Sequence, residues 1–419
     1  MTRPDFASAE GMGDTRNVLH GWLRRALVLV PLLALALAGC ASDAPQDTFK
    51  PEGPQARHID NLIIPVFAVA GVVFVVILAG CLYIALKYRA RDDADYDDMP
   101  KQIHGNVKAE IGWTIIPALI LVAVAVPTVV GVFKLNEDPP PDALHVEVIG
   151  QQWWWEYRYD IDDDGKFDDI VTANDLVIPA GREVALTITA RDVIHSFWVP
   201  RLNGKRDAVP NRNHPWKLEA DEPGEFIGQC TEYCGLSHAE MRIKTIALTE
   251  DDFQGWAERQ QGNAATFKEN DTSDAAQGYR LFVGQLCSSC HLIEGVNDDK
   301  FGGTGQDTGQ IKDQELQVSR HAPNLTHLMS RTTFAGAKFD LRKDTEACTA
   351  RGVRWADTEE GVAQCLDRAA LEAWLRNPPA RKAMAPEPVP GRTGTRGMPN
   401  LQLTEDQIDL LVAYLTTLK

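Results

Sequence analysis

The sequence predicts a multidomain protein in which a two-helix transmembrane hairpin is followed by an all-β sandwich and then by an all-α domain. Three observations predict this order. Long uncharged apolar stretches lie near the N-terminus, short alternating segments separated by turns fill the middle, and apolar residues at helical spacing mark the end. A chain of 419 residues is also long for one hydrophobic core, so several domains are expected.

The first apolar stretch has the order of an export signal. Arg24 and Arg25 precede a short apolar run that ends in Leu-Ala-Gly-Cys at Cys40. A basic start, a short apolar core and small residues at the end are typical of a signal peptide, and the run is too short to span a bilayer comfortably. Leu-Ala-Gly-Cys resembles a bacterial lipobox, in which Cys40 would be lipidated. We expect residues 1–39 to form a lipoprotein-type signal peptide and residues 40–61 an exported segment.

Residues 62–136 are expected to form the hairpin. The stretches Leu62–Leu86 and Trp113–Phe133 are each long and apolar enough to cross a membrane. The loop between them is rich in basic residues: Lys87, Arg89, Arg91, Lys101 and Lys108. The positive-inside rule places this loop in the cytoplasm, so everything after the hairpin lies outside. The expected location is the bacterial inner membrane, multi-pass, with the later domains on the extracytoplasmic side.

The exported part divides into two domains and a linker. Residues 137–259 contain alternating runs typical of strands, at 145–149, 183–189 and 243–248. Residues 260–273 are polar and are expected to form a linker. Residues 274–419 show helical punctuation, and Thr404 with Gln407 predicts a capping box at the start of the last helix.

A soft ligand set is concentrated within twelve residues of the β-domain. Cys230, Cys234, His238 and Met241 supply two thiols, an imidazole and a thioether, and His195 offers a second imidazole from a strand-like run. Thiolate and thioether ligands select copper over hard cations, and two cysteines can bridge two metals. The alternatives are a disulfide between the two cysteines, or a zinc site with the methionine in the core.

This segment resembles the copper A motif of cytochrome c oxidase subunit II, and the resemblance covers about residues 59–257. It implies a cupredoxin-like fold and two copper ions that are bridged by Cys230 and Cys234. The side chain of Glu232 would also reach a magnesium ion shared with the catalytic subunit. The implied copper ligands are His195, Cys230, Glu232 through its carbonyl oxygen, Cys234, His238 and Met241.

Two further positions carry over from the same resemblance. Trp153 corresponds to the tryptophan that passes electrons to copper, although core packing is the competing interpretation for its neighbours Trp154 and Trp155. Glu110 corresponds to a carboxylate near the entrance of a proton channel in the neighbouring subunit. On its own sequence context, Glu110 could equally be an interfacial charge.

A second redox motif opens the C-terminal domain. Cys287-Ser-Ser-Cys290-His291 has the spacing at which two thiols attach a haem covalently and the adjacent histidine binds its iron. A thioredoxin-like motif is the alternative. The region resembles class I cytochrome c, which implies Met398 as the sixth iron ligand, with Met384 as the next candidate. The other side chains that could serve are Met329, His321 and His327.

The C-terminal domain departs from a minimal cytochrome by an acidic insert at about residues 339–364. Cys348 and Cys365 bound this insert. Because exported cysteines are commonly oxidised, we predict a disulfide between them; the alternative is two free thiols.

The function that these motifs predict is electron input to a proton-pumping cytochrome c oxidase. A covalent haem c would pass electrons to two copper ions of copper A, and oxygen would be reduced in the partner subunit. The expected partners are catalytic subunit I, the other oxidase subunits and a respiratory donor complex containing cytochrome. The formal charge of −17 favours a basic partner and argues against nucleic acid.

Three other functions share parts of this pattern. Nitrous oxide reductase has a copper A motif but needs a further histidine-rich domain, which ten histidines do not supply. A copper-handling protein would not need the cytochrome motif or the membrane hairpin. Quinol oxidase subunits of the same fold lack the copper ligands that are present here.

Overall fold

The computed structural model describes residues 44–89, 102, 104–285, 287–297, 322–384 and 397–419. The predicted signal peptide, Cys40 and most of the predicted cytoplasmic loop lie outside these residues, as does His321.

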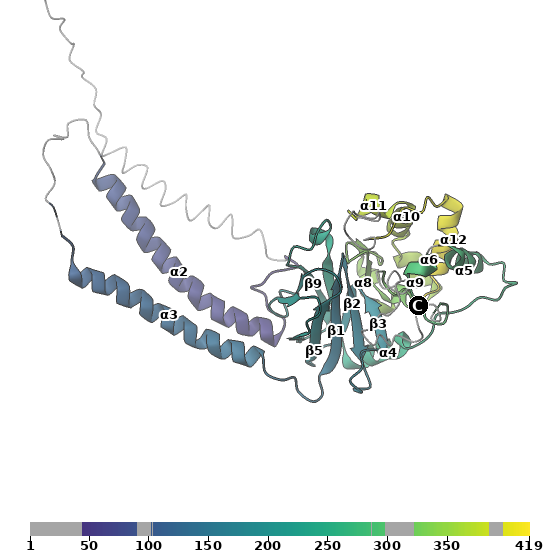
Figure 1. The fold of residues 1–419 in the computed structure, drawn as a ribbon, viewed down its shortest axis with the longest axis horizontal. Coiled ribbons are helices and arrows are strands. Elements are labelled where there is room, and N and C mark those ends of the chain that lie inside the picture. Colours follow the sequence, from purple (N-terminus) through teal and green to yellow (C-terminus); the bar gives the residue numbers. More distant parts are fainter. Residues whose placement is uncertain (1–43, 90–101, 103, 286, 298–321, 385–396) are drawn as a thin grey trace, which may run out of the picture. The chain divides into compact units, whose positions relative to one another are not determined.

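Two long helices form the membrane hairpin. Helix α2 spans Pro54–Lys87 and helix α3 spans Val107–Leu135, and both are long and apolar enough to cross a membrane (Figure 1). Their apolar side chains are largely exposed, which suits contact with lipid rather than with a protein core. At one end the helices touch, because Gly131 leaves room for the imidazole of His58.

Helix α2 begins earlier than the sequence predicts. Residues 54–61, expected to belong to an exported segment, are its first two turns, and Pro54 stands at a favourable first position after the N-cap Gly53. Hydropathy marks only the apolar part of a membrane helix, and these turns carry Arg57, His58 and Asp60. Helix α3 likewise begins before Trp113, where the side chain of Asn106 caps the amide of Ala109.

The β-domain is a sandwich of two five-stranded sheets. The first sheet has the order β3-β2-β1-β5-β8 and the second has the order β4-β10-β9-β6-β7. The strands of the first sheet are β1 (Leu144–Gln151), β2 (Trp154–Asp160), β3 (Ile170–Ala173), β5 (Val184–Ala190) and β8 (His214–Leu218). Those of the second are β4 (Asp175–Pro179), β6 (His195–Trp198), β7 (Arg206–Ala208), β9 (Gly224–Cys230) and β10 (Arg242–Leu248). The three strand runs predicted from the sequence correspond to β1, β5 and β10.

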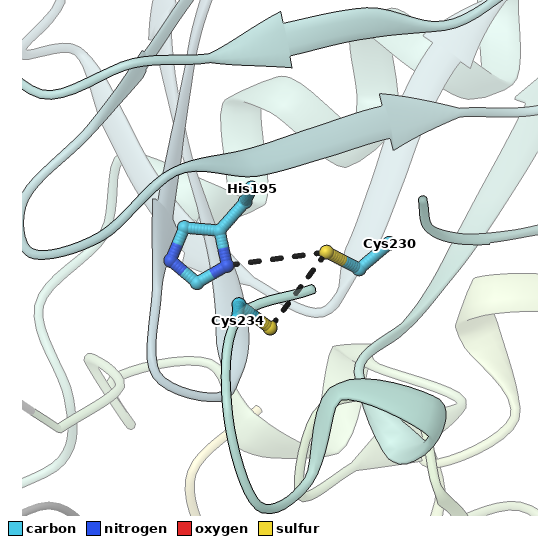
Figure 2. Close-up of side chains that lie close together, drawn as sticks. All are labelled: His195, Cys230 and Cys234. Atoms are coloured by element: carbon cyan, nitrogen blue, oxygen red, sulfur yellow. Dashed lines mark hydrogen bonds between the residues drawn. The ribbon is translucent and has the colours of Figure 1, made fainter. Parts of the chain in front are cut away.

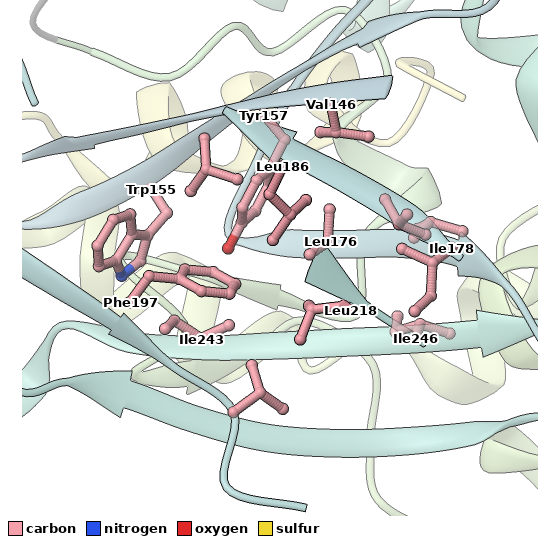
Figure 3. Close-up of a cluster of buried hydrophobic side chains, with 14 of the residues drawn as sticks. Val146, Trp155, Tyr157, Leu176, Ile178, Leu186, Phe197, Leu218, Ile243 and Ile246 are labelled. Atoms are coloured by element: carbon pink, nitrogen blue, oxygen red, sulfur yellow. The ribbon is translucent and has the colours of Figure 1, made fainter. Parts of the chain in front are cut away.

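The two sheets enclose one apolar core (Figure 3). Strand β5 shows the reason: its residues alternate between buried and half-buried positions, so one face of the strand points into the sandwich. Trp155, Tyr157 and Phe197 are fully buried in this core. Helix α4 (Glu250–Gln260) closes one side through Trp256, whose ring centroid lies 5.3 Å from that of Tyr159.

The C-terminal region is mainly helical. Its helices are α5 (Asp274–Gly284), α6 (Cys287–Cys290), α8 (Glu346–Thr349), α9 (Glu359–Cys365), α10 (Arg368–Arg376), α11 (Pro378–Arg381) and α12 (Glu405–Leu415). The described residues also include the short 3-10 helices η1 (His238–Glu240), η3 (Leu328–Ser330) and η4 (Gly352–Arg354). The all-α prediction omits a two-stranded pair, β11 (Thr333–Phe334) with β12 (Phe339–Asp340).

Helices α5 and α12 cross at Gly278. A Cβ atom at Gly278 would overlap the carbonyl oxygen of Leu410, so only glycine permits this close approach. The rings of Phe282 and Tyr414 pack beside the crossing with centroids 5.6 Å apart. The predicted capping box of α12 is confirmed, because Thr404 and Gln407 exchange side-chain and backbone hydrogen bonds.

The predicted linker is partly packed. Residues 260–273 are mostly polar, but Phe267 lies against Tyr279 and Tyr414 at centroid distances of 5.7 and 6.1 Å. Phe267 thus packs this part of the predicted linker against α5 and α12. A single aromatic residue is enough to anchor it, and composition averaged over fourteen positions hides that residue.

The predicted insert is folded into the domain rather than appended to it. A disulfide joins Cys348 to Cys365, the pair for which the sequence predicts one. Inside the closed loop, Trp355 is fully buried and its Nε1 donates to the carbonyl oxygen of Arg331 at 2.9 Å. Val353 enters the apolar core of the sandwich. The insert therefore contacts both domains.

Candidate metal centre

Two neighbouring strands place the soft ligands side by side. His195 is the first residue of β6 and Cys230 is the last residue of β9, and these strands pair at Phe197 and Cys230. The loop that follows β9 returns to β10 through η1 and carries the remaining donors, Cys234, His238 and Met241. Residues separated by 35 positions in sequence therefore meet at one end of the sandwich.

The donor atoms converge on a small buried space. The Sγ atoms of Cys230 and Cys234 lie 3.8 Å apart, and Nδ1 of His195 lies 4.0 Å from Sγ of Cys230 (Figure 2). On the other side, Nδ1 of His238 lies 3.6 Å from Sγ of Cys234, and the sulfur of Met241 lies 3.8 Å from the same atom. One imidazole therefore accompanies each thiol.

A backbone oxygen completes the set. The carbonyl oxygen of Glu232 lies 3.3 Å from Sγ of Cys230, while its side chain is exposed to solvent. The structure therefore brings together all six residues that the sequence predicts as copper ligands. They supply three sulfurs, two imidazoles and one carbonyl oxygen. His195, Cys230 and Cys234 in addition form a compact group of donor atoms of the kind that holds a metal ion.

The two thiols differ in their electrostatic surroundings. The hydrogen bond from Cys234 lowers the pKa of Cys230 to about 4, against the opposing effect of burial, and His195 adds to the lowering. The same pairing, together with burial, raises the pKa of Cys234. The site thus favours at least one thiolate before any metal is bound, which suits a soft cation.

Asp192 orients the first imidazole. Its carboxylate lies 2.9 Å from Nε2 of His195, on the ring edge opposite Cys230. Burial lowers the pKa of His195, but the interactions with Asp192 and Cys230 together outweigh it, so that the pKa is raised overall. Gly150 leaves space for the ring, because a Cβ atom there would lie only 3.0 Å from Cδ2 of His195.

Trp153 contacts the metal loop directly. Its Nε1 donates to the carbonyl oxygen of Cys234 at 3.1 Å, and Nε2 of Gln152 donates to the same oxygen at 2.6 Å. Trp155 lies in the core instead, with its ring 5.9 Å from that of His195 and 5.4 Å from that of Phe197. The tryptophan that the sequence selects is therefore the one at the site.

Glu110 lies far along the chain from these ligands, in the first turn of α3. Its carboxylate accepts a hydrogen bond from the backbone amide of Asn106 at 3.2 Å. A carboxylate in the first turn stabilises a helix, so this contact gives Glu110 a structural role independent of any proton channel.

The second motif lies at α6. Cys287 and Cys290 are free thiols at its two ends, and Nδ1 of His291 lies 2.8 Å from the carbonyl oxygen of Pro323. With Nδ1 occupied in this way, Nε2 is the nitrogen left to bind a metal. Burial lowers the pKa of His291, which keeps the ring in its neutral, ligating form.

The candidate sixth ligands lie in different surroundings. Met398 is partly buried and packs against the apolar core of the C-terminal region, whereas Met384 packs against the core of the sandwich. Both nitrogens of His327 face carbonyl oxygens, those of Lys419 and Gly262, at 2.6 and 2.8 Å. Met329 is buried, and its backbone amide donates to the carbonyl oxygen of Leu418 at 2.7 Å.

Sequence reasoning overlooks several residues at the first site. Asp192 stands three positions before His195, a spacing that could have indicated an orienting carboxylate. Lys382 donates to the carbonyl oxygen of Trp153 at 2.7 Å from 229 positions away, and no local pattern indicates such a contact.

These features define a class: a membrane-anchored electron-transfer protein whose β-sandwich holds a soft, two-thiol metal centre. Two family models match the chain, the transmembrane domain of cytochrome c oxidase subunit II over residues 46–130 and its periplasmic domain over residues 144–248. The chain belongs to the cytochrome c oxidase subunit II family, and it is an oxidoreductase subunit with a copper A site through which electrons enter.

Full-length relatives extend the similarity beyond these two domains. The chain is 36% identical to cytochrome c oxidase subunit 2 of Alkalihalophilus pseudofirmus, over 92% of this chain and 95% of the relative. It is 30% identical to that of Bacillus subtilis, over 94% and 98%. The solved periplasmic domain of subunit II from Bradyrhizobium japonicum is 30% identical, covers 30% of this chain and 97% of its own, and has a TM-score of 0.27.

Proposed function

We propose that this chain supplies electrons to a proton-pumping oxidase through two of its own redox centres, a covalent haem c and copper A. The observation that carries the proposal is the convergence of six soft or neutral donors, two of which are thiols with their sulfurs 3.8 Å apart. A dinuclear centre needs two bridging sulfurs and a terminal ligand on each metal, and the two imidazoles stand on opposite sides of the thiol pair. A disulfide would need a far shorter sulfur–sulfur distance.

The roles of the ligands follow from their positions. Cys230 and Cys234 would hold both coppers through their thiols, and His195 and His238 would bind one copper each. Met241 and the carbonyl oxygen of Glu232 would be the weaker ligands. A bound copper pair would supply a site that accepts one electron.

The chain itself keeps the site rigid and dry. Strands β6 and β9 fix His195 and Cys230 through their ladder, and Met241 is fully buried. Rigid ligands change little when the charge of the metal changes, which favours fast electron transfer.

The haem proposal rests on the C-terminal region. Cys287 and Cys290 would form thioethers to the haem, His291 would bind iron through Nε2 and Met398 would be the other iron ligand. Support comes from the His291–Pro323 contact and from the glycine-dependent crossing of α5 and α12. Alignment with full-length relatives over more than nine-tenths of the chain also extends far into this region.

Several finer assignments belong to the same proposal. The exposed side chain of Glu232 would bind magnesium at the boundary with catalytic subunit I. Glu110 would lie near a proton-channel entrance, and Cys40 would carry lipid. The redox domains would lie outside the bacterial inner membrane, with the other oxidase subunits and a cytochrome-containing respiratory donor as partners.

Metal and haem analysis of the full-length chain, purified in detergent, tests this function. We expect two coppers per covalent haem, and an electron paramagnetic resonance spectrum with hyperfine structure from two equivalent copper nuclei. A single copper, zinc, or no metal would contradict the copper A assignment. Copper without a covalent haem would contradict only the second centre.

A further inference from the structure

Residues 331–342, called here the docking segment, join the C-terminal region to the β-sandwich through buried polar contacts. The carboxylate of Asp175, on β4, is 2% exposed and accepts hydrogen bonds from the backbone amide and hydroxyl of Thr332 and from the hydroxyl of Thr333. The guanidinium of Arg331 is buried beside them and donates to the hydroxyl of Thr172 at 3.3 Å. Buried polar groups of this kind are satisfied in only one relative position of the two surfaces. In any other position they would lose their hydrogen-bond partners, which costs free energy.

The docking segment reaches the metal loop at Gly336. The backbone amide of Arg242, the residue after Met241, donates to the carbonyl oxygen of Gly336 at 2.9 Å. Gly336 has a φ of +74°, and a Cβ atom there would overlap both the carbonyl oxygen of Trp153 and Nζ of Lys382. Only glycine lets the segment approach so closely.

Lys382 connects the three parts that meet at this point. Its Nζ donates to the carbonyl oxygen of Trp153 at 2.7 Å and to that of Ala335 at 2.7 Å, and the residue is 3% exposed. Burial lowers the pKa of Lys382 to about 7. An ammonium group and a neutral amine both carry at least two N–H bonds, so either form can serve both carbonyl oxygens.

The residues after Lys382 continue across the metal loop. The hydroxyl of Ser237 donates to the carbonyl oxygen of Ala383, and the side chain of Met384 packs against the core of the sandwich. Met384 also fills the space over Gly397, the neighbour of Met398. The segment 382–384 therefore leads from the surroundings of the proposed haem ligand to Trp153, which is itself only 5% exposed.

We infer that Lys382 is a positioning residue, which holds the C-terminal domain against Trp153 so that copper A receives electrons from the haem of its own chain in one fixed geometry. This inference rests on the proposed function, because it needs both centres. The step is a one-electron transfer: the haem iron is oxidised, the copper pair is reduced, and no bond forms or breaks.

The test compares Lys382→Met with Lys338→Met in the purified oxidase complex. Lys338 is a matched control, since it lies in the docking segment and bonds Glu240 and the carbonyl oxygen of Arg381 without reaching Trp153. Two readouts are needed: hydrogen–deuterium exchange of residues 331–342, and the rate of copper reduction after flash photoreduction of the haem. Haem and copper contents are measured on every sample.

For Lys382→Met we expect faster exchange and a rate at least about tenfold lower, because two buried carbonyl oxygens lose their donor. Lys338→Met should stay within about twofold of the wild type on the rate, as is usual for a partly exposed ion pair. If Lys382→Met does not fold, Gly336→Ala is the second variant. Its Cβ atom would push the docking segment away from Trp153 and Lys382, so it should give the same faster exchange and lower rate.

Any other result for a variant with full haem and copper overturns the inference. An unchanged rate shows that Lys382 does not position the donor, and a slower rate without faster exchange shows that it acts by another route. A wild-type chain that lacks haem or copper contradicts the proposed function instead, and the metal analysis separates these two cases.

Discussion

Nε2 of His195 is held by the carboxylate of Asp192 at 2.9 Å, and the opposite nitrogen of the ring therefore faces the thiol of Cys230. A carboxylate behind a ligating imidazole fixes both the tautomer and the direction of the ring. This contact makes Asp192 part of the metal site, although it binds no metal itself.

Replacing Asp192 by alanine should weaken copper binding by about 10- to 100-fold, because the imidazole loses its orienting partner. The measurement is the copper retained per chain during titration with a chelator. Asp192→Asn is the matched control, since its amide oxygen can still accept the hydrogen bond from Nε2. Equal retention in the alanine variant and the wild type would show that the strand alone positions His195.

Replacing each methionine in turn shows whether Met398 or Met384 is the sixth ligand of the haem iron. Met398→Ala should leave the sixth position of the haem free, so that the ferrous protein binds carbon monoxide and its reduction potential falls. Met384→Ala should do neither, because Met384 packs against the sandwich core. Carbon monoxide binding in the Met384 variant alone would reverse the assignment.

The disulfide of the insert should stabilise the C-terminal domain. Closing a loop with a sequence separation of 17 is expected to contribute about 3 kcal/mol, so Cys348→Ser with Cys365→Ser should lower the unfolding temperature. Thermal unfolding followed by haem absorbance measures this change. Cys81→Ser is the control, since Cys81 is an exposed free thiol on α2. Identical unfolding of the double variant and the wild type would contradict the expectation.

Low pH should weaken the docking of the C-terminal region on the β-sandwich, because Glu225 loses its ion pairs when it is protonated. Burial raises the pKa of Glu225, but Lys244 at 2.8 Å and Arg342 at 2.7 Å outweigh this and lower it overall. A lowered pKa in the folded state means that its stabilising contribution is present above the ordinary value of about 4.5 and is lost as the pH falls further. Limited proteolysis of the docking segment between pH 7 and pH 4 measures the effect.

Glu225→Gln removes that titrating carboxylate and so provides the comparison. Its proteolysis should be faster than that of the wild type at pH 7, and the difference should shrink toward pH 4. Equal proteolysis of Glu225→Gln and the wild type at pH 7 would show that Glu225 does not contribute to docking.

Local patterns explain why much of the site could be predicted from the sequence. Cys230, Cys234, His238 and Met241 share one loop, so their spacing alone indicates their chemistry. His195 belongs to a strand-like run, and the structure makes it the first residue of β6, beside that loop. In the same way, Thr404 and Gln407 stand three positions apart and indicate the capping box at which α12 begins.

The contacts between the domains could not be predicted in this way. Asp175 meets Thr332, 157 positions later, and Trp153 meets Lys382, 229 positions later. Each partner is an ordinary polar residue in its own segment, and only the packing of two folded domains brings the pair together. The early start of α2 at Pro54 was missed for a different reason: its first turns are polar, and hydropathy detects only the part that crosses lipid.

The insert between Cys348 and Cys365 has a mechanical consequence. Val353 is lodged in the core of the sandwich, while Trp355, two positions later, is sealed in the core of the C-terminal region. Rotation of one domain against the other would pull one of these side chains out of its core. The disulfide-closed loop therefore anchors the β-sandwich and the C-terminal region to each other and resists their relative rotation.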